Sequence, residues 1–189
     1  MVSEQPFAVC VYCSASAADP AALRLAAEVG AEIARRGWQL VSGGGHVSMM
    51  GAVAVAARSG GAYTTGIIPK RLVHQEVADV ESDELIVTDT MRERKQLMED
   101  RADAFLTLPG GIGTLEEFFE AWTGGYLGLH AKPLVVLDPH GHYRGLFAWL
   151  DEVSAAGFIG RPALDRITVT SDVATAFDAL RRSEHRSKH

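Results

Sequence analysis

The sequence predicts a three-layer α/β sandwich in which helices cover both faces of a mostly parallel sheet of about seven strands. Short, uninterrupted apolar runs rich in Val, Ile and Leu recur along the chain, as expected for strands that are buried on both faces. Helical patterns lie between most of them, and this alternation is typical of parallel sheets. The expected strands are residues 7–12, 39–41, 65–68, 84–87, 104–106, 134–137 and 167–169.

The length and the sequence pattern indicate one domain. The chain has 189 residues, which is enough for a sizeable core, and no repeat or low-complexity linker divides it. We expect residues 1–181 to form this domain. Residues 182–189 have no apolar face, so we expect them to be a disordered tail. A first helix is expected after Asp19-Pro20, with apolar residues at helical spacing until Gly37.

Charge and hydropathy exclude several classes of partner. The formal net charge is −6, so the chain lacks the basic balance typical of nucleic-acid-binding proteins. No apolar run approaches the ~18 residues of a membrane span. The N-terminus also lacks the layout of a signal peptide, and we therefore expect a cytoplasmic protein without a membrane partner. A small anionic ligand remains compatible, because it needs only a few local donors.

The two cysteines, Cys10 and Cys13, have the C-x-x-C spacing of redox proteins. A redox pair is expected at the start of a helix, whereas these residues lie in and just after an expected strand. Residues three apart on a strand point to opposite faces. We therefore interpret both cysteines as small core residues.

Three polar or glycine-rich loops follow expected strands. They are residues 12–16 (Tyr-Cys-Ser-Ala-Ser), 42–46 (Ser-Gly-Gly-Gly-His) and 109–114 (Pro-Gly-Gly-Ile-Gly-Thr). In folds of this class, ligands bind beyond the carboxyl ends of the strands. The third loop also leads into an expected helix, where glycine N–H groups and the helix dipole favour a phosphate. The alternative is a plain capped turn, because Thr114 and Glu117 have capping-box spacing.

Arg94 stands out on the helix expected over residues 90–101, where Thr90 and Glu93 have capping-box spacing. Met91 and Met98 define an apolar face, and Arg94 projects from that same face. A buried cation requires a counter-charge or a ligand. The alternatives are a structural salt bridge or a side chain that extends to water.

Glu117 lies on the side of the next helix that carries only small residues, which leaves space above its carboxylate; the alternative is a capping role only. A phosphate-binding loop, a carboxylate one turn beyond it and a nearby arginine suit chemistry beside a sugar phosphate. Cleavage of an N-glycosidic bond passes through an oxocarbenium-like transition state, which a carboxylate stabilises. This chemistry requires no metal and no cofactor.

Two motifs carry a family resemblance. Residues 91–95 (Met-Arg-Glu-Arg-Lys) and 109–117 (Pro-Gly-Gly-Ile-Gly-Thr-Leu-Glu-Glu) resemble the paired signatures of the LONELY GUY proteins. These are cytokinin riboside 5'-monophosphate phosphoribohydrolases, some of which were once labelled lysine decarboxylases. The resemblance covers nearly the whole chain.

The resemblance implies a Rossmann-like homodimer with active sites near the subunit interface. It also implies hydrolysis of N6-modified adenosine monophosphates, and often AMP, to free base and ribose 5-phosphate. By motif, Arg94 and Glu117 are the expected catalytic pair. The expected substrate contacts are Ser14, Gly43, Gly44, Glu76, Met91, Lys95, Gly110, Gly111, Gly113, Thr114 and Thr123.

Two other functions remain open from the sequence. A nucleotide-binding or sensor module without turnover would use the same glycine loop. A pyridoxal-phosphate decarboxylase would need a Schiff-base lysine beside its cofactor. Of the four lysines (Lys70, Lys95, Lys132 and Lys188), only Lys95 is expected near the site. His140-Gly141-His142 follows Asp138-Pro139 and is interpreted as a turn rather than a metal site.

Overall fold

The computed structural model describes residues 6–17 and 19–181. Its centre is one sheet of seven strands in the order β4-β3-β2-β1-β5-β6-β7, and every neighbouring pair is parallel. The predicted α/β class is therefore confirmed. The strands are β1 (Ala8–Tyr12), β2 (Gln39–Ser42), β3 (Thr64–Pro69), β4 (Glu84–Thr88), β5 (Ala104–Thr107), β6 (Leu134–Leu137) and β7 (Ile167–Thr170).

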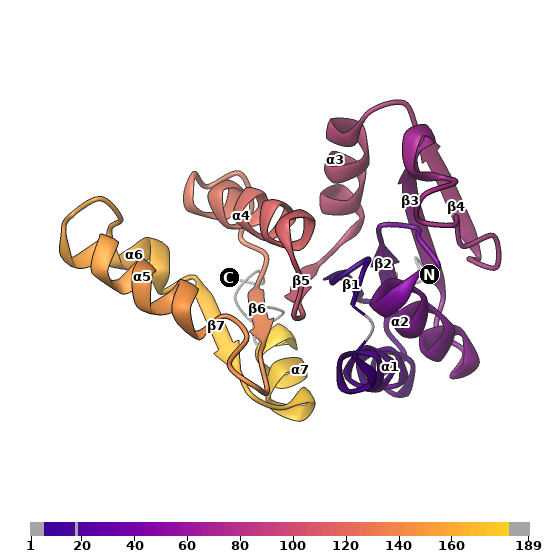
Figure 1. Cartoon of the computed structure of the whole chain (residues 1–189), viewed down its shortest axis with the longest axis horizontal. Coiled ribbons are helices and arrows are strands. Elements are labelled where there is room, and N and C mark those ends of the chain that lie inside the picture. Colours follow the sequence, from indigo (N-terminus) through magenta and orange to yellow (C-terminus); the bar gives the residue numbers. More distant parts are fainter. Residues whose placement is uncertain (1–5, 18, 182–189) are drawn as a thin grey trace, which may run out of the picture.

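Helices cover both faces of this sheet (Figure 1). On one face lie α1 (Pro20–Arg35), α2 (Ser48–Ser59) and α7 (Val173–Arg181); on the other lie α3 (Met91–Arg101), α4 (Ile112–Tyr126), α5 (Arg144–Ala155) and the short α6 (Arg161–Leu164). A 3-10 turn, η1 (Lys70–Leu72), follows β3. Each face has its own hydrophobic core.

The strand order reverses beside β1. The chain builds β2, β3 and β4 outward on one side of β1, then returns to place β5, β6 and β7 on the other side. Such a reversal opens a crevice beyond the carboxyl ends of the two central strands. The loops after β1 and β5, which carry Ser14 and the second glycine run, flank this switch point.

The predicted strands match the observed ones to within one residue at either end. The first helix also begins as predicted, because the Asp19 carboxylate accepts a hydrogen bond from the Ala21 N–H and Pro20 occupies the first helical position. Gly37 adopts a φ of 68° just after the helix, which explains why a glycine ends it.

Cys10 and Cys13 are both buried and free. Cys10 belongs to the core under α3 and α4, whereas Cys13 belongs to the core under α1 and α2. The prediction that they point to opposite faces is confirmed. Burial raises the pKa of both thiols well above the ordinary value, which disfavours a reactive thiolate.

Within the described ranges, none of the helices is both long enough and apolar enough to cross a lipid bilayer. Residues 182–189, for which the sequence predicts a disordered tail, lie outside the described residues.

Candidate active site

Arg94 is a buried cation near the carboxyl ends of the strands. Only 4% of it is exposed. Its Nε donates to the Ile67 carbonyl at 3.0 Å, and its Nη2 donates to the Gly43 carbonyl at 2.8 Å. These bonds fix the guanidinium plane, so the side chain does not extend to water as one sequence alternative had it.

The helix that carries Arg94 is capped as predicted. The Thr90 hydroxyl accepts a hydrogen bond from the Glu93 N–H at 3.1 Å, which starts α3. The expected apolar face is only partly right, because Met98 is buried whereas Met91 is 42% exposed. Met91 occupies the first helical position and packs at the rim, with its sulfur 3.9 Å from Arg94 Nη1.

Glu76 supplies a counter-charge for Arg94. Its Oε2 lies 3.3 Å from Arg94 Nη2. Burial raises the pKa of Glu76, although the guanidinium opposes the shift. The loop that carries Glu76 is attached to the first glycine loop: the His46 N–H donates to the Glu76 carbonyl, and the Asp79 N–H donates to the Gly44 carbonyl.

The first glycine loop is shaped around Arg94. A Cβ at Gly43 would lie 2.1 Å from Arg94 Nη2, and one at Gly44, where φ is 72°, would lie 2.9 Å from the Ile67 nitrogen. These distances do not test the predicted substrate contacts of Gly43 and Gly44. They show that both residues must be glycine for Arg94 and β3 to pack here.

The second glycine loop ends at Gly111, the N-cap of α4. The helix begins at Ile112, so Thr114 is its third residue rather than its cap, and the capping-box alternative for Thr114 and Glu117 is wrong. Thr114 is buried and packs against Gly110, where a Cβ would lie 2.1 Å from its Oγ1.

Gly111 and Gly113 differ from these packed glycines. Apart from the neighbouring residues in the chain and the backbone of α4 itself, no described atom lies within 4 Å of a Cβ built on either residue. The first N–H groups of a helix lack partners within the helix, and the helix dipole favours an anion there. A cleft of about 400 Å³ borders this point and is lined in part by Ser14, Gly110, Gly111, His140 and His142.

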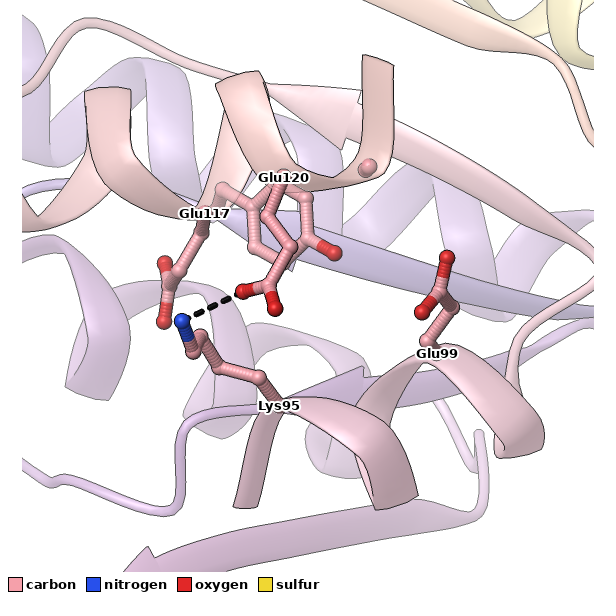
Figure 2. A pocket seen from close by; sticks show the side chains of 6 residues that line it. Lys95, Glu99, Glu117 and Glu120 are labelled. Atoms are coloured by element: carbon pink, nitrogen blue, oxygen red, sulfur yellow. Dashed lines mark ion pairs between the residues drawn. The ribbon is translucent and has the colours of Figure 1, made fainter. Parts of the chain in front are cut away.

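Glu117 lies one turn further along α4, in a narrow pocket whose lining also includes Tyr12 and Lys95. Figure 2 shows Glu117 and Glu120 reaching from α4 toward Lys95 on α3. Glu117 keeps some contact with solvent but lies deep among protein atoms, and this desolvation raises its pKa to about 7. The positive charge of the Arg94 guanidinium opposes that shift.

Lys95 forms ion pairs with Glu116 and Glu120 on α4 (Figure 2 draws the second). Burial alone would lower the pKa of Lys95, but the two carboxylates outweigh it and raise the pKa. This lysine is therefore held in its charged form.

Thr123 does not join these residues within one chain. It is exposed and lines a separate apolar groove of about 280 Å³ together with Phe119, Trp122, Tyr126 and Phe158. Its predicted substrate contact stays a prediction.

Three residues near the site were given no substrate-binding role of their own by the sequence reasoning. Tyr12 and Glu120 line the Glu117 pocket, and His142 contacts the second glycine loop at the Gly110 carbonyl. The signal for Tyr12 was available, because a polar-tipped residue at the carboxyl end of β1 must lie near the switch point. His140 and His142 lie in a turn, as predicted. In the described part of the chain, no three His, Cys, Asp or Glu side chains gather as a potential metal site.

The strand reversal and the open glycine loop define the class: an α/β protein with a cleft at its switch point, beside a helix N-terminus that favours an anion. Comparison with known proteins agrees. A family model described as "possible lysine decarboxylase" matches residues 50–180. A solved molybdenum cofactor binding protein from Rippkaea orientalis has the same fold, with a TM-score of 0.72, 25% identity and coverage of 93% of this chain and 96% of that one.

Two curated relatives are similar over almost their whole length. A protein of Mycobacterium tuberculosis is 60% identical over 92% of this chain and 91% of its own. One of Mycobacterium marinum is 56% identical over 94% of this chain and 96% of its own. Both are named cytokinin riboside 5'-monophosphate phosphoribohydrolase. The chain belongs to this family, which confirms the resemblance seen in its two motifs.

Proposed function

We propose that this chain hydrolyses the N-glycosidic bond of nucleoside 5'-monophosphates, releasing the free base and ribose 5-phosphate. The substrates are N6-modified adenosine monophosphates, the cytokinin nucleotides, together with AMP. Relatives at 56% and 60% identity over nearly the whole chain carry the name of this activity. The observation that carries the chemistry is Glu117, a deep carboxylate with a pKa of about 7 that feels the charge of Arg94.

The 5'-phosphate binds at the start of α4, where Gly111 and Gly113 leave the space open. This places the sugar toward Glu117, one turn along the helix. A water oxygen forms a bond to the anomeric carbon as the bond to the base nitrogen breaks. The water gives up one proton and the departing base gains one, so the products are ribose 5-phosphate and neutral base.

Glu117 acts in its ionised form in either of two roles. It stabilises the positive charge of the oxocarbenium-like transition state, or it accepts the proton from the attacking water. A pKa near 7 suits both, because half of the molecules hold the carboxylate ionised at neutral pH. Arg94 is fixed by two backbone carbonyls, and it provides a positioned charge for the carboxylate and the departing base.

The lysine decarboxylase alternative is disfavoured by Lys95. A Schiff-base lysine needs a lowered pKa, whereas Glu116 and Glu120 raise that of Lys95. Lys70 is exposed and paired with Asp89, and Lys132 donates to the Glu99 carbonyl. Lys188 lies outside the described residues.

A binding module without turnover is the second candidate, because one fold hosts both hydrolases and binding proteins. It is disfavoured by the desolvation of Glu117, since a carboxylate kept only for structure would gain from a paired or solvated position.

The oligomeric state and the cellular location are part of the same proposal. The protein forms a homodimer with its active sites near the interface, supported by the apolar groove beside Tyr126 and Phe158, which are 58% and 85% exposed. It works in the cytoplasm, where reducing conditions suit two free, buried cysteines.

The deciding experiment is base release from AMP, N6-isopentenyl-AMP and adenosine, measured by chromatography. We expect both nucleotides to be cleaved and adenosine to be turned over at least about a hundredfold more slowly, because it lacks the phosphate. Glu117→Ala and Arg94→Ala are expected to lose about 10²- to 10⁴-fold in kcat. Arg101→Ala, at the far end of α3, is the matched control and keeps normal activity.

Binding separates the two candidates. Tight nucleotide binding without release of base by the wild-type chain would support the binding module and reject the hydrolase. Equal turnover of adenosine and AMP would remove the role given to the glycine loop.

The pH dependence is a second test of Glu117. Because the carboxylate must be ionised, kcat for AMP is expected to rise as pH increases toward about 7 and then to level off. A rate that stays flat between about pH 5 and pH 8 would exclude Glu117 as the ionising group.

A further inference from the structure

The loop between β6 and α5 is attached to the second glycine loop through side chains. His142 Nε2 lies 2.9 Å from the Gly110 carbonyl oxygen, and the Tyr143 hydroxyl donates to the Leu108 carbonyl at 2.8 Å. A carbonyl only accepts hydrogen bonds, so His142 donates through a protonated Nε2. His142 and Tyr143 thus contact the carbonyls of the two residues that precede and follow Pro109.

The attaching loop is itself fixed. Both carboxylate oxygens of the buried Asp138 accept backbone hydrogen bonds, from the His142 N–H at 2.7 Å and from the Tyr143 N–H at 2.8 Å. Gly141 adopts a φ of 72° in the turn between them. His142 therefore reaches Gly110 from a rigid support, although the residue is partly solvent-exposed.

The bond to Gly110 controls the direction of one N–H group. In a planar trans peptide, the Gly110 carbonyl and the Gly111 N–H point in opposite directions. Thr114 packs against the Gly110 side of this peptide, whereas a Cβ built on Gly111 would meet no side chain within 4 Å, so the Gly111 side faces open space. Once His142 fixes the carbonyl, the Gly111 N–H must point to the other side, at the start of α4.

Building on the proposed function, we infer that His142 is a positioning residue that orients the Gly110–Gly111 peptide to donate to the 5'-phosphate of the substrate. It acts on the binding of the phosphate and not on the bond that breaks. Its loss therefore raises KM for AMP and weakens binding of ribose 5-phosphate, while kcat changes little. The inference needs only a neutral N–H donor at position 142, not an imidazolium charge.

His140 provides the contrast that separates these two mechanisms. It lines the same cleft, yet within the described residues no hydrogen bond joins it to the glycine loop. If a positive histidine charge attracted the phosphate directly, both histidines would contribute. If peptide orientation matters, only His142 contributes.

The test is calorimetric titration with ribose 5-phosphate, which the enzyme does not consume, in the full-length wild type, His142→Ala, His142→Gln and His140→Ala. We expect His142→Ala to weaken binding about five- to tenfold, as for the loss of one hydrogen bond. His142→Gln, which keeps an N–H donor at similar reach, and His140→Ala are expected to stay within about twofold of wild type. In kinetics, His142→Ala raises KM for AMP by the same factor.

Three results would overturn the inference: unchanged binding in His142→Ala, failure of His142→Gln to rescue, or equal weakening in His140→Ala. Tyr143→Phe, which removes the hydroxyl that donates to the Leu108 carbonyl, is a second variant if His142→Ala does not fold. It is expected to weaken binding in the same direction. Absence of ribose 5-phosphate binding in the wild type would reject the proposed function as well, whereas wild-type binding without base release would reject only the function.

Discussion

The two glycine loops of this protein are alike in sequence but opposite in what surrounds them. In the loop after β2, atoms of other residues occupy the space that a side chain would need. A Cβ at Gly43 would meet Arg94 at 2.1 Å, and one at Gly45 would meet Met50 at 2.6 Å. In the loop after β5, no described atom lies within 4 Å of a Cβ at Gly111 or Gly113.

The difference separates glycines that shape the protein from glycines that leave room for a ligand. Gly43 lets the backbone approach a guanidinium and accept its hydrogen bond at 2.8 Å. Gly111 and Gly113 keep the start of a helix accessible, where unpaired N–H groups and the helix dipole favour a phosphate. The first loop therefore organises Arg94, and we assign the second to the substrate.

The greatest loss of activity is expected from a substitution in the loop after β2. Gly43→Ala places a methyl group where Arg94 Nη2 lies, so the guanidinium must leave the Gly43 carbonyl. We expect kcat for AMP to fall about a hundredfold or more, because a positioned charge is displaced. The unfolding temperature should fall by a few degrees. Base release and thermal unfolding measure the two effects.

A matched control is Gly145→Ala in α5, where no described atom lies within 4 Å of the added Cβ. It should leave activity unchanged. If Gly43→Ala retained full activity, Arg94 would not need its observed position.

A smaller effect is expected from the second loop. Gly113→Ala adds a methyl group in open space inside the first turn of α4, so the fold should be unchanged or slightly stabilised. The same methyl group crowds the phosphate, and we expect kcat/KM for AMP to fall about tenfold. The slow turnover of adenosine should not change.

A loss of kcat/KM for AMP without a loss for adenosine is the result that would assign Gly113 to the phosphate. Equal losses for AMP and adenosine would mean that the loop serves the fold or the sugar rather than the phosphate.

A change in stability, smaller than these effects on activity, is expected at Glu117, one turn beyond the second glycine loop. The pKa of Glu117 rises from 4.5 to about 7 on folding, so the folded state holds this proton more tightly than the unfolded chain. Stability is therefore lost as pH increases from about 4.5 to about 7. Glu117→Gln should raise the unfolding temperature by a few degrees at about pH 8 and hardly at all at about pH 4.5.

Thermal unfolding at the two pH values tests this directly. Glu152→Gln, an exposed glutamate on α5, is the control and should show no such pH-dependent gain. An equal shift of Glu117→Gln at both pH values would contradict the raised pKa.

Much of the fold was predictable because its signals are local. Buried parallel strands need continuous apolar runs, and the ends of all seven were found to within one residue. The Asp19 cap, the Gly37 stop and the Thr90 cap follow from backbone chemistry within a few residues. The buried face of α3 was also visible, since Arg94 lies one turn from Met98.

Other features depended on contacts between distant segments. The sequence did not show that Glu76, in the long connection between β3 and β4, reaches within 3.3 Å of Arg94; only the motif resemblance pointed to it. The capping interpretation of Glu117 was wrong because α4 begins at Ile112, three residues earlier than that spacing requires. Thr123 matched the family pattern, yet it faces a groove away from the Glu117 pocket.

The α/β class, the strands and the two family motifs can be recognised from the sequence alone, because periodicity, helix caps and short motifs depend on neighbouring residues. Which glycines are packed against protein atoms and which face open space became known from the three-dimensional fold, because that depends on side chains from other elements. The same holds for the raised pKa of Glu117 and for the contact between His142 and Gly110. Burial and long-range contacts arise only when the sheet brings its strand ends together.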